Sequence, residues 1–206
     1  MNFWNWLKSL FSEKPAQKKK QDGILVLIVG HSARAPGAKA VAPLSMSEYP
    51  YNNTIIAPEC VRYGREIGLT VEVLTKDAMG TQAVGAKASS LVKAVGKGCV
   101  IELHFNAANG VASGTETLYS TKIAKNKVFA EIVQKHMVSV FRKPNRGLKL
   151  RNTGRGASNL AAVSVPCCLV EPLFGDTKGD SELLKDKSYA YARSLVDAAV
   201  EFINGT

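Results

Sequence analysis

Residues 24–29 form an unbroken run of six apolar residues, ILVLIV, four of them β-branched. A run of this length and composition is typical of a strand that is buried on both faces. Such strands belong to parallel sheets that carry helices on either side. Gly30 and His31 follow the run directly, so we expect a titratable side chain at the end of a central strand.

After this run, strand and helix patterns alternate along the chain. Further strands are expected at 70–74, 99–103, 116–120 and 167–170. Helices are expected at 53–67, around 84–95 and at 123–141, and a last one is expected to be capped by Asp180 or Ser181. This alternation predicts an α/β fold with a single, mainly parallel twisted sheet layered by helices.

The first 22 residues differ in composition from the rest. They hold both tryptophans and a lysine-rich stretch, and we expect them to form an amphipathic helix followed by a basic tether, with a separate folded domain over residues 23–206. One arc of that helix would carry the apolar residues Phe3, Trp4, Trp6, Leu7, Leu10 and Phe11. It could lie on a membrane surface or dock on protein, and the pattern does not distinguish these. Polar residues interrupt the segment, so it is not a typical secretion signal.

The overall charge restricts the function classes. The formal net charge is +10 at pH 7, which favours anionic partners such as nucleic acid, anionic lipid or a cell envelope. The chain has no pattern typical of a nucleic-acid-binding motif, so we expect no nucleic-acid partner. It also has no apolar run of about 20 residues, which argues against an integral membrane protein. A basic segment, Arg142–Arg155, is expected to be a solvated loop or a basic wall beside an active site.

The four cysteines, Cys60, Cys99, Cys167 and Cys168, form no CxxC pair. We expect buried free thiols rather than disulfides or zinc ligands.

Three of the expected strands end in side chains that could bind a metal or transfer a proton. These are His31, His104 and Glu171, and ligands of α/β folds bind beyond the carboxyl ends of strands. A catalytic zinc site needs three protein ligands and an open position, so the two histidines need a third partner. The candidates are Glu48, Glu59, Glu66 and Glu102, and spacing does not choose among them. The third histidine, His136, lies on an expected helix, and we expect it to be a structural or half-exposed residue rather than a ligand.

Five strings occur in the order found in one enzyme family. They are GH at 30–31, EYPYN at 48–52, ELHFNA at 102–107, SGTETLY at 113–119 and LVEPLFGD at 169–176. Together they resemble the zinc-dependent N-acetylmuramoyl-L-alanine amidases of the amidase-3 type, which include bacterial cell-wall amidases and phage endolysins. The resemblance covers about residues 24–204 and implies a phosphorylase/hydrolase-like amidase fold. The chain departs from the family in its TRxD motif, which reads LTKD here, with Lys76 in place of the arginine.

The resemblance implies roles for individual residues. It implies one Zn²⁺ per chain, held by His31, Glu48 and His104, with Glu171 as the catalytic carboxylate. Glu102 is then a structural carboxylate or one that lies behind a ligand. As substrate-binding residues we expect Asn106, Thr115 and Arg146, the first two because they neighbour the site and the last because it lies in the basic segment.

The function implied is hydrolysis, by zinc-activated water, of the amide between N-acetylmuramic acid and L-alanine of the stem peptide. The alternatives are a zinc peptidase or carboxypeptidase on cell-wall peptides, or a basic membrane- or wall-binding protein without activity. We expect peptidoglycan as the partner, membrane contact through residues 1–14 and a monomer. Without a secretion signal, the resemblance favours a phage-type endolysin, held in the host cytoplasm before release and acting on the cell wall or periplasm.

Overall fold

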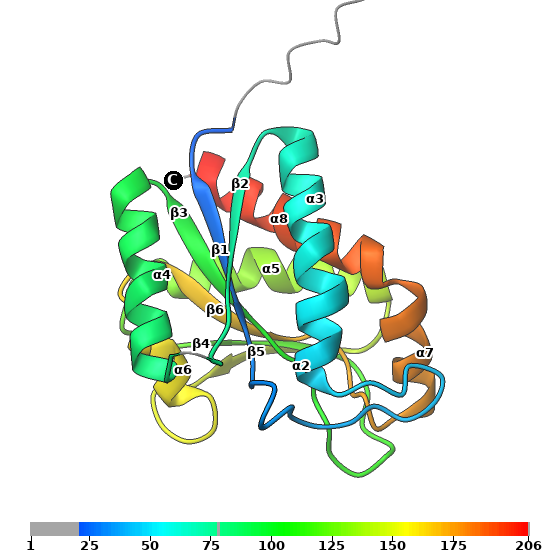
Figure 1. Ribbon diagram of the computed structural model, residues 1–206. Helices are drawn as coiled ribbons and strands as arrows, with labels where there is room; N and C mark the ends of the chain where they lie inside the picture. Colours follow the sequence, from blue (N-terminus) through cyan, green and yellow to red (C-terminus); the bar gives the residue numbers. More distant parts are fainter. Residues whose placement is uncertain (1–20, 78, 206) are drawn as a thin grey trace, which may run out of the picture.

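The computed structural model describes residues 21–77 and 79–205, which form one six-stranded sheet covered by helices on both faces (Figure 1). The strands are β1 (Ile24–Val29), β2 (Thr70–Leu74), β3 (Gly98–Leu103), β4 (Thr115–Tyr119), β5 (Asn145–Leu150) and β6 (Cys167–Glu171). Their order across the sheet is β2-β1-β3-β6-β4-β5. The predicted α/β class is confirmed. The expected helix within residues 1–22 falls almost entirely outside the described residues.

The sheet is mainly parallel, as predicted, with one antiparallel junction. β1 lies between β2 and β3 and runs parallel to both, and β6 runs parallel to β3. β4 then runs antiparallel to β6, and β5 runs parallel to β4. The carboxyl ends of β1, β3 and β6 therefore meet at one edge of the sheet, where the metal-capable residues were expected.

The basic segment contains the edge strand that the sequence pattern did not reveal. Residues 145–150 form β5, so the expectation of a loop over the whole of 142–155 is wrong for this stretch. β5 has a strand neighbour only on the β4 side and is at most half-buried, which explains its polar sequence NRGLKL.

The helical elements connect the strands. They are α2 (Glu48–Tyr51), a π-helical turn (Asn52–Ile56), α3 (Ala57–Ile67), α4 (Thr81–Val95), α5 (Asn126–Phe141), α6 (Ala157–Ala162), α7 (Lys178–Asp186) and α8 (Ser188–Asn204). The expected last helix is two helices, separated at Lys187. The expected N-cap at Asp180 or Ser181 is wrong, because α7 begins at Lys178 with Thr177 as its N-cap. The Asp180 carboxylate instead accepts hydrogen bonds from the amides of Gly114 and Phe174 and so joins two loops.

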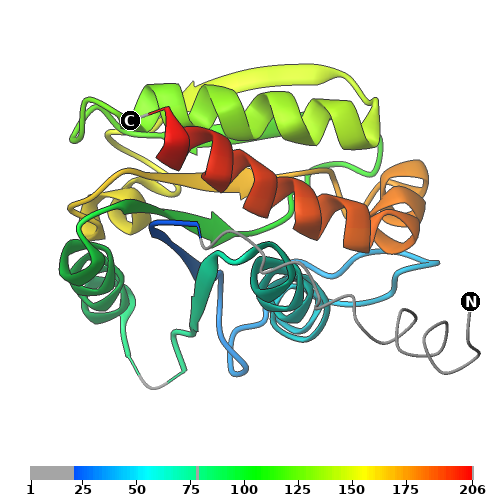
Figure 2. The ribbon, with the colours of Figure 1, turned by 90° about the horizontal axis from the view of Figure 1, so that it is seen from above.

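Alternate residues of β1 build two separate hydrophobic cores. Leu25, Leu27 and Val29 face the layer of α3, α5 and α8, whereas Ile24, Val26 and Ile28 face α4 and α6. Figure 2 shows α5 and α8 running side by side along their face of the sheet. The cores make β1 a rigid support for the residues that follow it.

The cysteines confirm the expectation of buried free thiols. All four are buried and unbridged, and Cys167 and Cys168 project into opposite cores from β6. Among the described residues no helix combines the length and apolar character needed to cross a bilayer.

Candidate metal centre

His31 lies just beyond the carboxyl end of β1 in a left-handed conformation, with φ at 65°. The backbone around it is closely packed, and two glycines permit this. A Cβ on Gly30 would lie 2.5 Å from the His104 ring, and a Cβ on Gly37 would lie 2.6 Å from the His31 ring. Neither position accepts a side chain without displacing a histidine.

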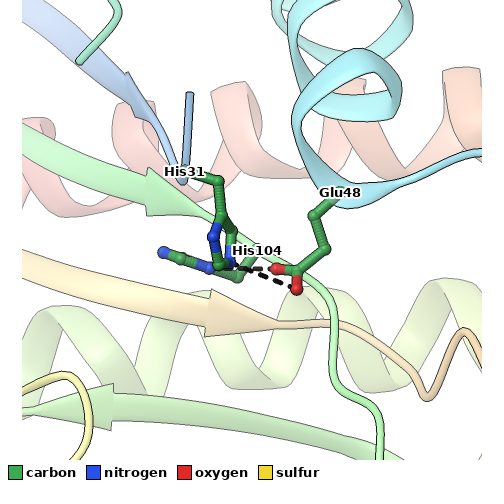
Figure 3. A group of neighbouring side chains, drawn as sticks. All are labelled: His31, Glu48 and His104. Carbon is green, nitrogen blue, oxygen red and sulfur yellow. Dashed lines mark hydrogen bonds and ion pairs between the residues drawn. The ribbon is translucent and has the colours of Figure 1, made fainter. Parts of the chain in front are cut away.

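Glu48 is the first residue of α2 and is fully buried. Its Oε1 accepts a hydrogen bond from the Ala38 amide, and its Oε2 accepts one from the Phe105 amide. The same two oxygens lie 3.2 Å from His31 Nε2 and 3.0 Å from His104 Nδ1 (Figure 3). Burial raises the pKa of this carboxyl, but the bonds from both histidines outweigh it and lower the pKa to about 2. Glu48 is therefore an ionised carboxylate between two imidazoles.

His104 follows β3 directly and is buried. Its ring has a carboxylate on each side, because Nδ1 faces Glu48 and Nε2 lies 3.0 Å from Glu102 Oε1. Burial lowers the pKa of His104, whereas the bonds to Glu102 and Glu48 raise it, and the result is a pKa of about 10. A site this rich in negative charge attracts a cation, either a proton on the ring or a metal ion.

The three side chains fit a divalent cation. One ligand atom from each of His31, Glu48 and His104 lies within 4.8 Å of the others. With metal–ligand bonds of about 2.0–2.1 Å, a tetrahedral zinc ion separates its ligand atoms by about 3.3 Å. The separations to Glu48 of 3.0 and 3.2 Å are close to this value. His31 Nε2 is also buried and has the Glu48 carboxylate at 3.2 Å, as expected of a nitrogen that shares a metal ion with that carboxylate. Two imidazoles and one carboxylate form a donor set typical of catalytic zinc.

Glu171 ends β6 beside this cluster. It lines a cavity of about 170 Å³ together with His31, His104, Arg155 and Asn159. Burial raises the pKa of Glu171 to about 8, although His104 acts in the opposite direction. Its Oε2 is buried with no hydrogen-bond partner in the described part of the chain. A carboxyl with this pKa and a free oxygen can accept and donate a proton near neutral pH.

The three expected substrate-binding residues are not among the residues that line this cavity, and two of them contact a carboxylate that the sequence reasoning missed. Glu116 of β4 accepts hydrogen bonds from Asn106 Nδ2 and Arg146 Nε, at 2.9 and 2.8 Å. Arg146 also covers the Phe174 ring, and Thr115 is fully buried with its hydroxyl bonded to Gln134. Glu116 lies opposite Glu171 in the antiparallel pairing of β4 with β6. The position of Glu116 within the SGTETLY string is the sequence signal that could have identified it.

The remaining candidates lie outside the three-residue cluster. Glu59 and Glu66 are paired with Arg62 on α3. His136 is on α5 and pairs with Glu201 of α8, which agrees with its expected structural role. Glu102 contacts His104 from the side away from Glu48, and its pKa is lowered to about 2, because bonds to His104 and Lys76 outweigh burial.

Comparison with known proteins identifies the family. The family model of N-acetylmuramoyl-L-alanine amidase matches residues 25–203. The chain belongs to the Amidase_3 family. The match includes all four expected metal and catalytic residues. A search of curated proteins finds no match.

Solved structures agree with this assignment. The catalytic domain of the CD27L endolysin, which targets Clostridia difficile, is 26% identical and has a TM-score of 0.69 over 87% of this chain and 97% of that domain. The catalytic domain of CwlV from Bacillus (Paenibacillus) polymyxa, 17% identical, has a TM-score of 0.70 over 89% and 99%. An amidase from Clostridium difficile 630, 22% identical, has a TM-score of 0.67 over 89% and 96%. The last two share the fold of this Amidase_3 chain.

Proposed function

We propose that this amidase hydrolyses the bond between the lactyl group of N-acetylmuramic acid and L-alanine of the stem peptide, using one zinc ion bound by His31, Glu48 and His104. Membership of the Amidase_3 family makes the chain a peptidoglycan amidase. The observation that carries the metal assignment is the convergence of these three side chains, from three separate parts of the chain, onto one point.

The carboxylate and the two imidazoles contribute differently to the proposed site. Glu48 supplies the negative charge, and amides of Ala38 and Phe105 hold its two oxygens in place. The imidazoles are neutral ligands, so a bound zinc ion keeps a net positive charge. Such an ion lowers the pKa of a water molecule towards about 7 and polarises the scissile carbonyl.

Glu171 transfers the proton in this proposal. Its carboxylate takes a proton from the attacking water as the water oxygen bonds to the carbonyl carbon. It delivers that proton to the amide nitrogen as the C–N bond breaks, which yields a lactyl carboxylic acid and a stem peptide with an alanine amine. The acid proton then passes to the amine, which leaves a carboxylate and an ammonium group. The support is its place in the cavity with both histidines and its pKa, which burial raises to about 8.

Arg155 is the member of the basic segment that lines this cavity. Among the described residues, its guanidinium forms no close ion pair with a carboxylate, although its charge acts on Glu171 in the same cavity and opposes the rise in the pKa of that carboxyl. We therefore add Arg155 to the proposed substrate-binding residues, as the group that attracts carboxylates of the stem peptide. Asn106 and Arg146 would act through Glu116, which lies opposite Glu171 in the pairing of β4 with β6. Thr115 is buried against Gln134 and would act only by supporting β4.

The decisive experiment combines zinc stoichiometry with mass spectrometry of digested sacculi. We expect one zinc per chain, released stem peptides that begin with a new alanine amino terminus, and no new sugar reducing ends. His104→Ala should lose both zinc and hydrolysis, whereas the exposed-carboxylate control Glu182→Gln should keep both. Chelation should stop the wild-type enzyme, and added zinc should restore it. Shortened peptides in place of intact stems would indicate a peptidase.

The biological role proposed is that of a phage-type endolysin, acting as a monomer on the wall after release from the host cytoplasm. The likeness to the CD27L endolysin domain supports it. Residues 1–14 are proposed to contact the membrane through their aromatic residues. Replacing Trp4 and Trp6 with alanine in the full chain should reduce sedimentation with anionic phospholipid vesicles and leave hydrolysis of sacculi unchanged. Unchanged sedimentation would exclude this membrane contact.

A further inference from the structure

Glu102 is a buried carboxylate that the proposed mechanism does not use. It lies on β3, is 4% exposed, and its Oε1 accepts hydrogen bonds from three side chains. The donors are Lys76 Nζ at 2.5 Å, Asn159 Nδ2 at 2.5 Å and His104 Nε2 at 3.0 Å. These donors come from the loop after β2, from α6 and from the end of β3. A carboxylate costs several kcal/mol to bury unpaired, so this convergence needs an explanation.

The contacts of Glu102 indicate which nitrogen of a metal-bound His104 carries the hydrogen. Glu102 Oε1 is an acceptor, because Lys76 and Asn159 both donate to it. The Nε2 of His104 must therefore be protonated to bond with it. Without a metal ion both ring nitrogens face carboxylates and both can carry a hydrogen. When a metal ion replaces the hydrogen on Nδ1, the neutral ring keeps the one on Nε2, and the lone pair is left on Nδ1.

The lone pair on Nδ1 then points toward the cluster of His31, Glu48 and His104. His104 Nδ1 lies 3.0 Å from Glu48 Oε2, and the other oxygen of Glu48 lies 3.2 Å from His31 Nε2. Nδ1 is thus the His104 nitrogen on the side of the metal cluster, and Nε2 is turned away from it. A histidine ligand whose second nitrogen donates to a carboxylate is held in both tautomer and orientation.

We propose that Lys76, Glu102 and Asn159 are positioning residues, which hold His104 as the Nε2–H tautomer and present Nδ1 to the zinc ion. This inference rests on the proposed metal role of His104. Lys76 acts through Glu102, because it donates to the same oxygen that accepts from His104, and the side chain of Lys76 is itself only 12% exposed. Asn159 fixes the same oxygen from α6, in the wall of the active-site cavity.

A purely structural pair would give different results. If Lys76 and Glu102 only held the loop after β2 against β3, removing either would lower stability and leave zinc affinity unchanged. The positioning role instead predicts a change in zinc affinity and in the electronic state of the His104 ring.

The first test measures zinc affinity by competition with a chromophoric chelator. Glu102→Gln should weaken zinc binding about 10–100-fold. Lys76→Met should weaken it in the same direction, and the double variant should be close to Glu102→Gln alone, since both act through one contact. The matched control is Glu201→Gln, which alters a histidine–carboxylate pair away from the metal cluster, His136 Nε2 to Glu201 at 2.8 Å. This control should bind zinc as tightly as the wild type.

The second test needs no variant that must fold. In zinc-loaded protein with ¹⁵N-labelled histidine, long-range ¹H–¹⁵N spectra should show Nε2 of His104 protonated and Nδ1 bound to metal. Metal on Nε2, or unchanged zinc affinity in folded Glu102→Gln, would overturn this inference alone. Failure of the wild-type chain to bind zinc would overturn the proposed function as well.

Discussion

The imidazole rings of His31 and His104 meet edge to face, with centroids 4.9 Å apart and planes at 71°. This contact follows from the parallel pairing of β1 with β3, in which Val29 lies opposite Leu103. His104 follows Leu103 directly, whereas Gly30 intervenes before His31. The Gly30 amide continues the ladder by donating to the Leu103 carbonyl, and the left-handed backbone of His31 then ends the extended segment. Strand register thus positions His31 and His104, and the loop between β1 and α2 brings Glu48, the first residue of α2, beside them.

Gly37 tests how tightly that loop is fitted. It has φ at +79°, and a Cβ there would lie 2.6 Å from the His31 ring and 2.8 Å from Glu48 Oε1. Gly37→Ala should displace one of these ligands and weaken zinc binding at least 10-fold, as measured by chelator competition. Gly96→Ala is the control, because Gly96 has φ at +82° with open space around its Cβ position. Both variants should lose about 1 kcal/mol of stability from backbone strain, and equal zinc affinities would contradict the prediction.

Glu171→Gln separates metal binding from proton transfer. The variant keeps the size of the side chain but cannot accept or deliver the proton, so turnover on sacculi should fall about 10²–10⁴-fold. Zinc content should stay at the wild-type level, because Glu171 lies outside the three-residue cluster. Elemental analysis and release of alanine amino termini, measured on the same preparation, check both parts. Loss of zinc together with turnover would instead make Glu171 a ligand.

Arg155→Gln tests the proposed attraction of anionic stem peptides. We expect KM for a soluble muramyl peptide with free carboxylates to rise several-fold, with a smaller change in kcat, because the guanidinium attracts substrate and takes no proton. The same peptide with its carboxylates amidated should show little difference between variant and wild type. Arg142→Gln is the control from the same basic segment. An equal effect on both peptides would remove the carboxylate interaction.

The strands and ligands could be predicted where the local sequence decides the structure. The apolar run at 24–29 and the β-branched stretch TVEVL at 70–74 became β1 and β2 with the expected bounds, because both patterns are local. β5 could not be found this way, because its sequence NRGLKL has no apolar run and no β-branched residue. The antiparallel junction between β4 and β6 is also a long-range choice that the residues of neither strand reveal.

The site residues also divide into those that the local sequence identifies and those that only the fold brings together. His31, His104 and Glu171 stand at strand ends and could be found from the sequence, whereas Glu48 needed the family resemblance to distinguish it from Glu102. Glu102 is surrounded by donors 26 and 57 residues away along the chain. No spacing rule connects residues at such separations, so its contacts emerged only from the fold.

Glu59 gives a pH-dependent prediction for stability. It accepts two hydrogen bonds from Arg62, both at 2.7 Å, and one from Arg193 at 3.0 Å, so it joins α3 to α8. The bonds from Arg62 are the main cause of its lowered pKa, with burial opposing them and Arg193 adding to them. A carboxyl with a folded-state pKa below its unfolded value of about 4.3 stabilises the fold above that pH. This stabilisation is lost as the pH falls through the lower, folded-state value.

Glu59→Gln should therefore lower the free energy of unfolding by about 1 kcal/mol at pH 7, a modest value because both arginines are half-exposed. The difference from wild type should shrink as the pH falls below about 4, where the wild-type carboxyl also becomes protonated. Urea unfolding with a chelator present measures this without a contribution from metal loss. Glu131→Gln is the control, since its exposed pair with Lys127 spans 3.9 Å and should contribute almost nothing. A difference for Glu59→Gln that stays constant down to pH 3 would show that lost packing, rather than lost charge, destabilises the variant.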